Sequence, residues 1–486
     1  MDFMDNLDDP NSYKANKKVY KKALKIKDVE LQRCREKIIE QKLQIDALTK
    51  IRDELGANLS EVLNSKGWRA LDKLRKIIPK KKATNTNSHE DRAKDETEDV
   101  KGVTVKATYN SHYEDDFDFS KLNNAPKVKA LAFYLPQFHT FPENDEWWGK
   151  GFTEWTNTKK SKPRFEGHYQ PREPHDDIGY YALDNVETIK KQVALAKEHG
   201  IYGFCFYYYW FSGKRLMEKP LDLFLKDRSI DFHFCLCWAN ENWTRTWDGM
   251  DKNILIKQEF KKEDPKKFIL DMKKYLVDPR YIKIDNKPLI LIYNPDSIPD
   301  FENTMKEWRK TAKEIGIGEI FICSKNTMAD RDLKNIDFVD AEFEFAPVGH
   351  GQYFIQNPIE VNDNHCYFNY GKTVTDFKKI YHDHISATPF YYSCTMGWDN
   401  SARKKKDYWV LGKYSPEKFY DWLNIIIEET ERRFPEDNRF IFINAWNEWA
   451  EGTYLEPDKK YGYTNINTAS KAIYGLPYDF KPPKKA

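Results

Sequence analysis

The chain has 486 residues, of which 32% are charged and 15% aromatic. Its 79 Lys and Arg residues nearly balance its 77 Asp and Glu residues. This balance argues against nucleic-acid binding as the main function, because such proteins carry a strong basic excess. The mean hydropathy is −0.81, and no apolar run approaches the roughly 18 residues that a membrane-spanning helix needs.

The first residues, Met1 to Asp5, are acidic and lack the apolar stretch of a signal peptide. There are seven cysteines, an odd number, and most fall within apolar runs, which favours free thiols in a reducing compartment. Neither the cysteines nor the histidines show the paired spacing of a structural metal site. We therefore expect a cytoplasmic protein with no metal and no cofactor.

Residues 1–64 are rich in Lys, Glu and Leu, and apolar residues recur every 3.5 residues from Leu31 to Val62. Such a period over about four heptads predicts a short coiled coil, and with it a homo-oligomer. Two polar residues, Gln41 and Arg52, interrupt the seam. A lone solvated helix is therefore the alternative.

Residues 65–82 place Trp68 and several Leu and Ile residues at helical spacing among many Lys and Arg residues. A basic amphipathic helix of this kind is typical of a membrane-surface anchor and predicts peripheral attachment at the inner membrane face. The alternative is a solvated helix end followed by a Lys-rich linker. Residues 83–125 hold few apolar residues and predict a disordered linker.

From residue 126 to 475, eight apolar runs alternate with helical segments. The runs are 128–135, 202–208, 232–238, 289–293, 320–324, 338–345, 389–395 and 439–446. Most are continuously apolar, as parallel strands covered on both faces are. Helices are expected at 185–199, 265–277, 301–315, 374–385 and 416–434. The alternation predicts an α/β fold, a TIM-like (β/α)8 barrel followed by a tail at 476–486. A doubly wound open sheet is the alternative, weakened by the lack of a glycine-rich phosphate loop after the first run.

Active sites of such barrels lie at the carboxyl ends of the strands, and these ends are rich in Trp, Asn and Glu. Indole faces stack on sugar rings, and polar side chains pair with sugar hydroxyls, so the set predicts a carbohydrate site. For any single tryptophan, core packing is the alternative. The expected substrate-binding residues are Tyr134, Gln137, His139, Trp148, Glu154, Trp155, Tyr208, Trp238, Asn240, Glu241, Asn242, Trp243, Arg245, Trp398, Asp399, Asn447 and Trp449.

Glu448 and Glu451 follow the last run and are three residues apart. If the chain turns helically there, their Cβ atoms come within about 5–6 Å. Glycosidic bonds are commonly cleaved or formed by two carboxyl groups, one that protonates the leaving oxygen and one that assists attack. We therefore expect Glu448 and Glu451 to be catalytic, with Glu241 and Asp399 as the next candidates. The same spacing also occurs on solvated helices.

Four segments resemble the WbsX family of bacterial polysaccharide-biosynthesis proteins, which are named as glycosyltransferases. They are AFYLPQFH (132–139), FCLCWANENWTRTWDG (234–249), GWDN (397–400) and NAWNEWAEG (444–452). The resemblance covers about residues 128–470. It implies an enzyme of surface-polysaccharide assembly, such as O-antigen or capsule biosynthesis. The segment after the coiled coil, SKGWR (65–69), is similar to the leader of some bacterial polysaccharide glycosyltransferases.

That family is in turn similar to family 99 glycoside hydrolases, which are endo-α-mannosidases with (β/α)8 barrels. By this resemblance Glu448 acts as a base toward the sugar 2-hydroxyl, and Glu451 acts as acid and then base at the glycosidic oxygen. Glu456 belongs to the same motif and is implied to bind substrate. The reaction is implied to proceed with retention and without metal. The sequence departs from the hydrolases at Ala450, where they carry a histidine.

Transfer and hydrolysis both remain open on physical grounds. A transferase needs a lipid- or nucleotide-linked sugar donor besides its glycan acceptor, whereas an endo-acting retaining hydrolase needs only an oligosaccharide. A glycosyltransferase is our first expectation and the hydrolase the second. A third hypothesis is a non-catalytic carbohydrate-binding barrel.

Overall fold

The computed structural model describes residues 112–481, except 246–249, 327–336, 363, 385 and 387. The predicted coiled coil at 1–64, the basic segment at 65–82 and the first part of the predicted linker lie outside the described residues. Among the described residues, no helix is long and apolar enough to cross a membrane.

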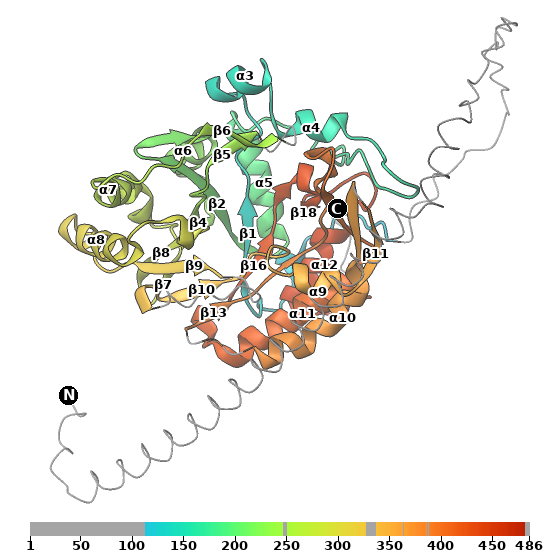
Figure 1. Cartoon of the computed structure of the whole chain (residues 1–486). Helices are drawn as coiled ribbons and strands as arrows, with labels where there is room; N and C mark the ends of the chain where they lie inside the picture. The colour runs from blue at the N-terminus through green and yellow to red at the C-terminus, as the bar shows by residue number, and fades with distance from the viewer. Residues whose placement is uncertain are drawn as a thin grey trace, which may run out of the picture. The chain divides into compact units, whose positions relative to one another are not determined.

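A parallel sheet forms the centre of the fold (Figure 1). Nine of its eleven strands pair in the order β13-β10-β9-β8-β4-β2-β1-β16-β14, and every pairing along this path is parallel. Only Tyr392 separates β13 from β14, so the path nearly closes into a barrel, with the seventh predicted run divided between its two ends. The strands are β1 (Lys129–Tyr134), β2 (Ile201–Phe211), β4 (His233–Trp238), β8 (Lys287–Ile292), β9 (Phe321–Lys325), β10 (Ala341–Phe343), β13 (Phe390–Tyr391), β14 (Ser393–Thr395) and β16 (Phe440–Asn444).

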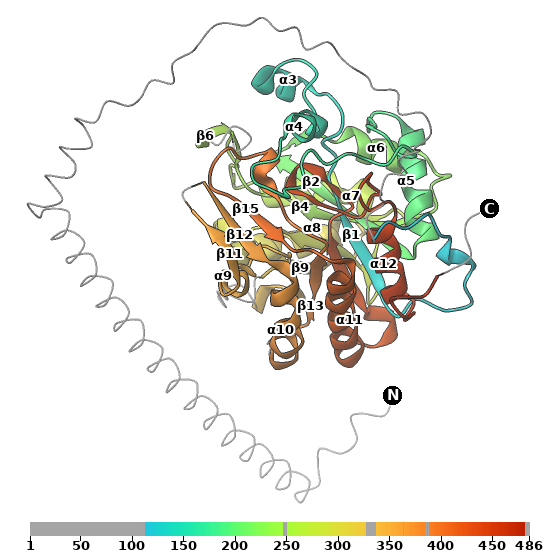
Figure 2. The same cartoon turned by 90° about the vertical axis from the view of Figure 1, so that its right-hand side faces the viewer.

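Helices surround the strands (Figure 2). They are α5 (Val186–Glu198), α6 (Lys219–Lys226), α7 (Asp264–Leu276), α8 (Phe301–Glu314), α10 (Tyr370–Asp383), α11 (Pro416–Arg433) and α12 (Thr464–Ile473). The predicted TIM-like α/β architecture is confirmed. Helix α12 was not predicted; all ten of its residues are buried in the fold, although several of them are polar.

Shorter elements decorate the loops. The helices are α3 (Pro142–Trp148), α4 (Glu154–Lys160) and α9 (Gly351–Ile355), with 3-10 turns η1 (Phe119–Lys121), η3 (Pro295–Ser297), η5 (Asn400–Ala402), η6 (Glu436–Asn438) and η7 (Trp449–Glu451). The strands are β3 (Lys214–Leu216), β5 (Trp243–Arg245), β6 (Met250–Ile256), β7 (Lys283–Ile284), β11 (Pro358–Val361), β12 (His365–Asn369), β15 (Tyr408–Gly412), β17 (Asn447–Glu448) and β18 (Thr453–Tyr454). Strands β11, β12 and β15 form a separate sheet, and β5–β6 and β17–β18 form two hairpins.

An aromatic layer fills the barrel. The Phe133 ring of β1 lies 6.1 Å from Phe343 of β10 and 5.5 Å from Phe442 of β16. Because β1 and β10 are not neighbours in the sheet, the contact with Phe343 crosses the interior. Replacing one such buried Phe by Ala would lower the free energy of unfolding by about 3–5 kcal/mol. This aromatic layer therefore stabilises the strands whose carboxyl ends carry the site.

Residues 112–125 are packed against this barrel. The Phe119 ring is fully buried and lies 5.6 Å from His199 and 6.2 Å from Tyr474. Lys471 pairs with Glu114 over 2.7 Å. The predicted linker is therefore wrong for these residues. The composition of residues 83–125 as a whole is polar, and this average obscures the few aromatic residues, such as Phe119, that pack residues 112–125 against the barrel.

Candidate active site

The turn after β16 carries the two predicted catalytic residues. Glu448 ends β17 and caps the 3-10 turn η7, and Glu451 closes that turn. In a 3-10 turn residues three apart eclipse one another, so the two carboxylates leave the turn on one side. Gly452 follows with φ of 66°, and a Cβ there would stand 2.9 Å from both Arg172 Nε and Asp399 Cβ. The turn therefore requires glycine at this position.

A third carboxylate and one guanidinium complete this group, which we call the Arg403 cluster (Glu154, Arg403, Glu448 and Glu451). Arg403 follows η5, in the connection from β14 to β15. It donates to Glu154 Oε1 over 2.7 Å and to Glu448 Oε2 over 2.8 Å. Its other terminal nitrogen donates to Glu451. Three acidic side chains thus share a single cation.

Burial shapes the protonation of the cluster. The side chain of Glu154 is 0% exposed and that of Glu448 is 6% exposed, whereas that of Glu451 is 21% exposed. Burial raises the pKa of Glu448 well above its usual range and also raises that of Glu154, although Arg403 opposes both shifts. The raised pKa values favour the protonated form of a carboxyl group in the cluster, which can then act as a proton donor.

Two tyrosines of β2 face the cluster. Burial and then the charge of Glu448 raise the pKa of the Tyr207 and Tyr209 hydroxyls. Tyr208, the residue predicted to bind substrate, points the other way, because successive side chains alternate across a strand. Its ring packs 6.0 Å from Phe268 of α7. The prediction chose the wrong face, and the alternation along the strand was the signal that could have corrected it.

The side chain of Trp238 also points away from the Arg403 cluster. Its ring is 4.5 Å from Phe268 and 5.7 Å from Trp308, and its Nε1 donates to the Trp210 carbonyl over 3.2 Å. It belongs to the layer between the sheet and helices α7 and α8. Its expected role in substrate binding is therefore wrong, and the alternative of core packing holds.

Four of the predicted residues form a buried brace behind the turn. Glu456 accepts from Trp449 Nε1 over 2.7 Å and from Gln192 Nε2 over 2.7 Å. Gln192 in turn accepts from the Tyr134 hydroxyl over 2.7 Å. Asn447 makes two hydrogen bonds to the backbone of residue 135, which fix the end of β1. These side chains hold the turn in place and present no free polar group to a ligand.

Two tryptophans that follow β1, Trp148 and Trp155, were predicted to bind substrate, and they lie in different environments. Trp155 is buried, lies 5.2 Å from Trp449 and donates to the Tyr181 carbonyl over 2.8 Å. Trp148 is partly exposed and stacks on Phe152 at 5.5 Å. Trp155 therefore packs behind the cluster, whereas Trp148 stands at the outer rim.

Trp398 and Asp399 follow β14. Trp398 lies 5.5 Å from Trp409. Asp399 is fully buried, accepts from His168 and Gln170, and donates through its backbone N–H to the Glu451 carbonyl over 2.7 Å. Burial would raise its pKa, but these donors and the Arg172 charge lower it to about 2. Asp399 is thus a permanent anion that anchors the turn carrying Glu448 and Glu451.

The remaining predicted residues occupy several positions. Gln137 and His139 are buried after β1. Asn240 is tied to the Asn294 carbonyl over 2.6 Å. Glu241 and Asn242 are exposed, and the side chain of Arg245 lies outside the described part of the chain.

Trp243 packs against Tyr209 at 5.2 Å and against Trp147 at 6.4 Å. Because Tyr209 faces the Arg403 cluster, Trp243 lies on the same side of β2 as the cluster.

The sequence analysis did not identify two cationic residues near the carboxyl ends of the barrel strands, Arg403 and Lys325. Arg403 stands in the polar run ARKKKD (402–407), which has the composition of a solvated loop. Lys325, at the end of β9, lies 3.4 Å above the Tyr293 ring, and burial lowers its pKa. No local pattern marks either residue. Among residues that the structure describes, no group of three His, Cys, Asp or Glu is placed to hold a metal ion.

Comparison with known proteins identifies the family to which the chain belongs. The family model "Glycosyltransferase WbsX" matches residues 130–469. The chain belongs to the WbsX glycosyltransferase family. Two curated WxcX proteins, from two strains of Xanthomonas campestris pv. campestris and described as uncharacterized, are 39% identical over 354 residues. The alignment covers 71% of this chain, which spans about half the length of those relatives.

Solved structures similar to this WbsX chain have low sequence identity. A glycoside hydrolase-like protein aligns with a TM-score of 0.46 and 13% identity, over 72% of this chain and 95% of its own. A GH99 endo-alpha-mannosidase from Bacteroides thetaiotaomicron aligns with a TM-score of 0.42 and 16% identity, over 70% and 95%. At these values the likeness has no bearing on the chemistry of the site.

Proposed function

We propose that this WbsX-family chain is a glycosyltransferase of surface-polysaccharide biosynthesis, and that Glu448 and Glu451 carry its chemistry. The observation that supports this most is the Arg403 cluster. Three acidic side chains at the carboxyl ends of barrel strands share one guanidinium in a largely buried, aromatic-walled site. Carboxyl pairs of this kind are what glycosidic chemistry uses.

The two carboxylates differ in a way that suits two roles. We assign the roles that the resemblance of the motif at 447–452 implies, with Glu448 as the base toward the sugar hydroxyl and Glu451 as the proton donor to the glycosidic oxygen. Glu448 is the more buried of the two, and Glu451 is more open to solvent. Arg403 acts through them as a positioning residue, because it holds together carboxylates that would otherwise repel one another.

Unpaired polar atoms around the cluster supply the means to hold a sugar. Glu154 Oε2, Gln137 Nε2 and Trp398 Nε1 are buried and make no hydrogen bond within the described structure. Buried polar groups are normally paired, so a polyhydroxylated ligand would satisfy them. This supports a glycan as the substrate.

Hydrolysis is the second candidate, and one geometric observation favours it. Retaining glycosidases place their two carboxyl groups about 5–5.5 Å apart, and Glu448 and Glu451 are close enough to bind one guanidinium. The discriminating experiment incubates the full chain with bacterial oligosaccharides and a panel of nucleotide- and polyprenyl-diphosphate-linked sugars, and follows products by mass spectrometry.

Addition of a sugar to the oligosaccharide, lost in Glu451→Gln but kept in the exposed control Glu187→Gln, supports transfer. Release of reducing ends without any donor would establish hydrolysis instead. If sugars bind the chain and no bond is made or broken by either route, the non-catalytic barrel replaces both.

We also infer, from the sequence of residues 1–82 alone, attachment to the inner membrane face and self-association. Replacing Lys80, Lys81 and Lys82 by Gln should reduce sedimentation of the full chain with anionic vesicles at low salt. A polar change at Leu48 should lower its oligomeric mass in light scattering. Unchanged sedimentation would overturn the anchor, and unchanged mass would overturn the coiled coil.

A further inference from the structure

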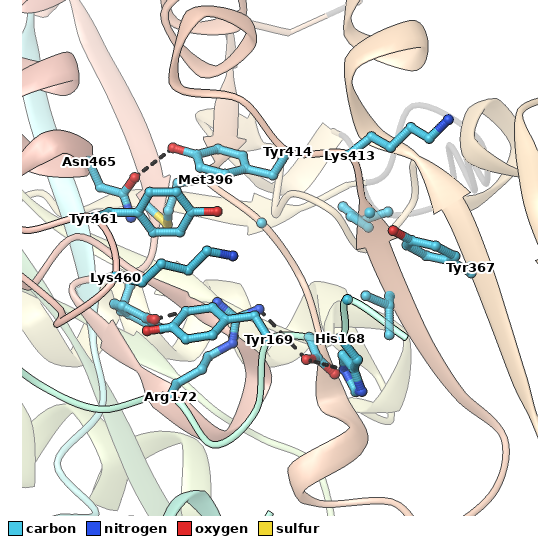
Figure 3. A pocket seen from close by; sticks show the side chains of 18 of the residues that line it. His168, Tyr169, Arg172, Tyr367, Met396, Lys413, Tyr414, Lys460, Tyr461 and Asn465 are labelled. Atoms are coloured by element: carbon cyan, nitrogen blue, oxygen red, sulfur yellow. Dashed lines mark hydrogen bonds and ion pairs between the residues drawn. The ribbon is translucent and has the colours of Figure 1, made fainter. Parts of the chain in front are cut away.

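A pocket adjoins the residue that follows Glu451, and Figure 3 shows it from close by. It has a volume of about 100 Å³, and Gly452, the residue after Glu451, forms part of its wall. Pockets that enclose a drug-sized ligand measure about 300–1,000 Å³, so this one admits only a small group. We call it the Lys460 pocket, lined among others by Tyr169, Arg172, Asp399, Lys460 and Tyr461.

Two cations of this pocket have unused donors. The Lys460 ammonium lies over the rings of Tyr169 and Tyr461, at 4.3 and 4.9 Å, and extends into the open centre in Figure 3. Across the described part of the chain, no carboxylate oxygen lies within 4.0 Å of that ammonium. Arg172 Nε is buried and makes no hydrogen bond within the described structure.

The acceptors of the pocket are already occupied. Asp399 accepts from His168 over 2.9 Å, from Gln170 over 2.7 Å and from the Ser401 N–H over 3.1 Å. Asp458 accepts from the hydroxyls of Tyr454 and Tyr169 and from the Tyr461 N–H, over 2.7, 3.1 and 2.6 Å. The pocket therefore offers hydrogen-bond donors to a ligand, while the oxygens of its carboxylates are already bound to other groups.

The positive charges of Lys460 and Arg172 also repel each other. Burial lowers the pKa of Lys460, and the nearby Arg172 charge lowers it further. An anion between them would remove this repulsion. The Tyr461 hydroxyl, which points into the same space in Figure 3, makes no hydrogen bond among the described residues and can donate as well.

We propose that the Lys460 pocket binds a phosphate oxyanion, and that in the working enzyme this is the phosphate of an activated sugar donor. The role rests on the proposed function, whereas the anion site itself does not. Because Gly452 is both the wall of the pocket and the neighbour of Glu451, a phosphate held there would present its attached sugar beside the catalytic turn. Such a site would provide phosphate binding, for which the sequence shows no glycine-rich loop after the first strand.

The test measures pyrophosphate binding to the full chain by isothermal titration calorimetry, without turnover. Lys460→Met should weaken binding on the order of 10- to 100-fold, as the loss of charge-assisted hydrogen bonds does. The matched control is Lys459→Met, because Lys459 is exposed and pairs with Asp176 over 3.4 Å. It should bind as the parent does. Lys460→Arg should keep most of the affinity.

Tyr461→Phe gives a second probe that removes only one hydroxyl, and it should weaken binding by a smaller factor if Lys460→Met fails to fold. Equal binding by the parent and by these variants would overturn the site. Tighter binding of glucuronate than of pyrophosphate would overturn the phosphate and assign the pocket to an acidic sugar.

The catalytic proposal fails separately. Glu451→Gln should still bind pyrophosphate, because Glu451 is not needed for the anion. If pyrophosphate binds through Lys460 but the chain only hydrolyses oligosaccharides, the anion site stands and its role toward a donor is overturned.

Discussion

Two buried carboxylates, Glu456 and Glu448, stand eight residues apart in the sequence and differ in their bonding partners. Glu456 is surrounded by neutral donors, from Trp449, Gln192 and Tyr181. Glu448 and its partners instead share a single guanidinium. Hydrogen bonds hold the Glu456 side chain in place, whereas the shared cation gathers three carboxyl groups at one point. We therefore expect Glu456 to position the turn and the Arg403 cluster to react.

The largest expected effect is on catalysis. Glu448→Gln and Glu451→Gln should each lower the rate by about 10²–10⁴, the usual contribution of a general acid or base. The double variant should cost far less than the product of the two, because residues that act as one unit are not additive. Rates are measured with the substrate identified by the product screen. Full activity in both single variants would move the chemistry to Glu241 or Asp399.

Removing the shared cation should have the largest effect on stability. Arg403→Gln leaves three carboxylates without their partner and should lower the free energy of unfolding by about 3–5 kcal/mol. The loss should be smaller at about pH 4 than at about pH 7, because the carboxyls with raised pKa values protonate first. Urea unfolding measures both, with the exposed Arg164→Gln as control. A pH-independent loss would argue that the three acids are already neutral.

The brace should respond to pH through Glu456. Burial raises its pKa from 4.5 to about 7, so its contribution to stability is present below about 4.5 and is lost as pH rises through about 7. Relative to Glu456→Gln, the parent should lose about 3 kcal/mol of unfolding free energy between these limits. Chemical denaturation across this range measures it. Parallel pH profiles of parent and variant would show that Glu456 stays ionised in the folded protein.

The smallest expected effects separate the two faces of β2. Tyr209→Phe should lower activity by about tenfold while leaving stability nearly unchanged, because its hydroxyl faces the cluster. Tyr208→Phe should change neither by much, and it should tend to stabilise, since the buried Tyr208 hydroxyl has no hydrogen-bond partner in the described structure. Thermal unfolding and rate assays compare them. The reverse pattern would place the cleft on the other face of the strand.

The sequence predicted the barrel because eight long apolar runs alternate with amphipathic helical segments. It did not reveal which face of a run turns inward. Strands buried on both sides, such as β2 and β4, are apolar at every position, so Tyr208 and Trp238 look like Tyr207 and Tyr209. The candidate pair Glu448 and Glu451 could be proposed from the sequence because both residues stand on one short turn. Arg403 and Glu154 come from distant loops and meet the pair only in the fold.

The most direct test of the central claim is a crystal structure of Glu451→Gln soaked with oligosaccharides and sugar nucleotides. The account predicts a sugar under Tyr209 and Trp243, with its glycosidic oxygen within hydrogen-bond distance of residue 451 and a hydroxyl within that distance of Glu448. A sugar bound elsewhere on the chain, with the Arg403 cluster unchanged and without contact to it, would contradict the account.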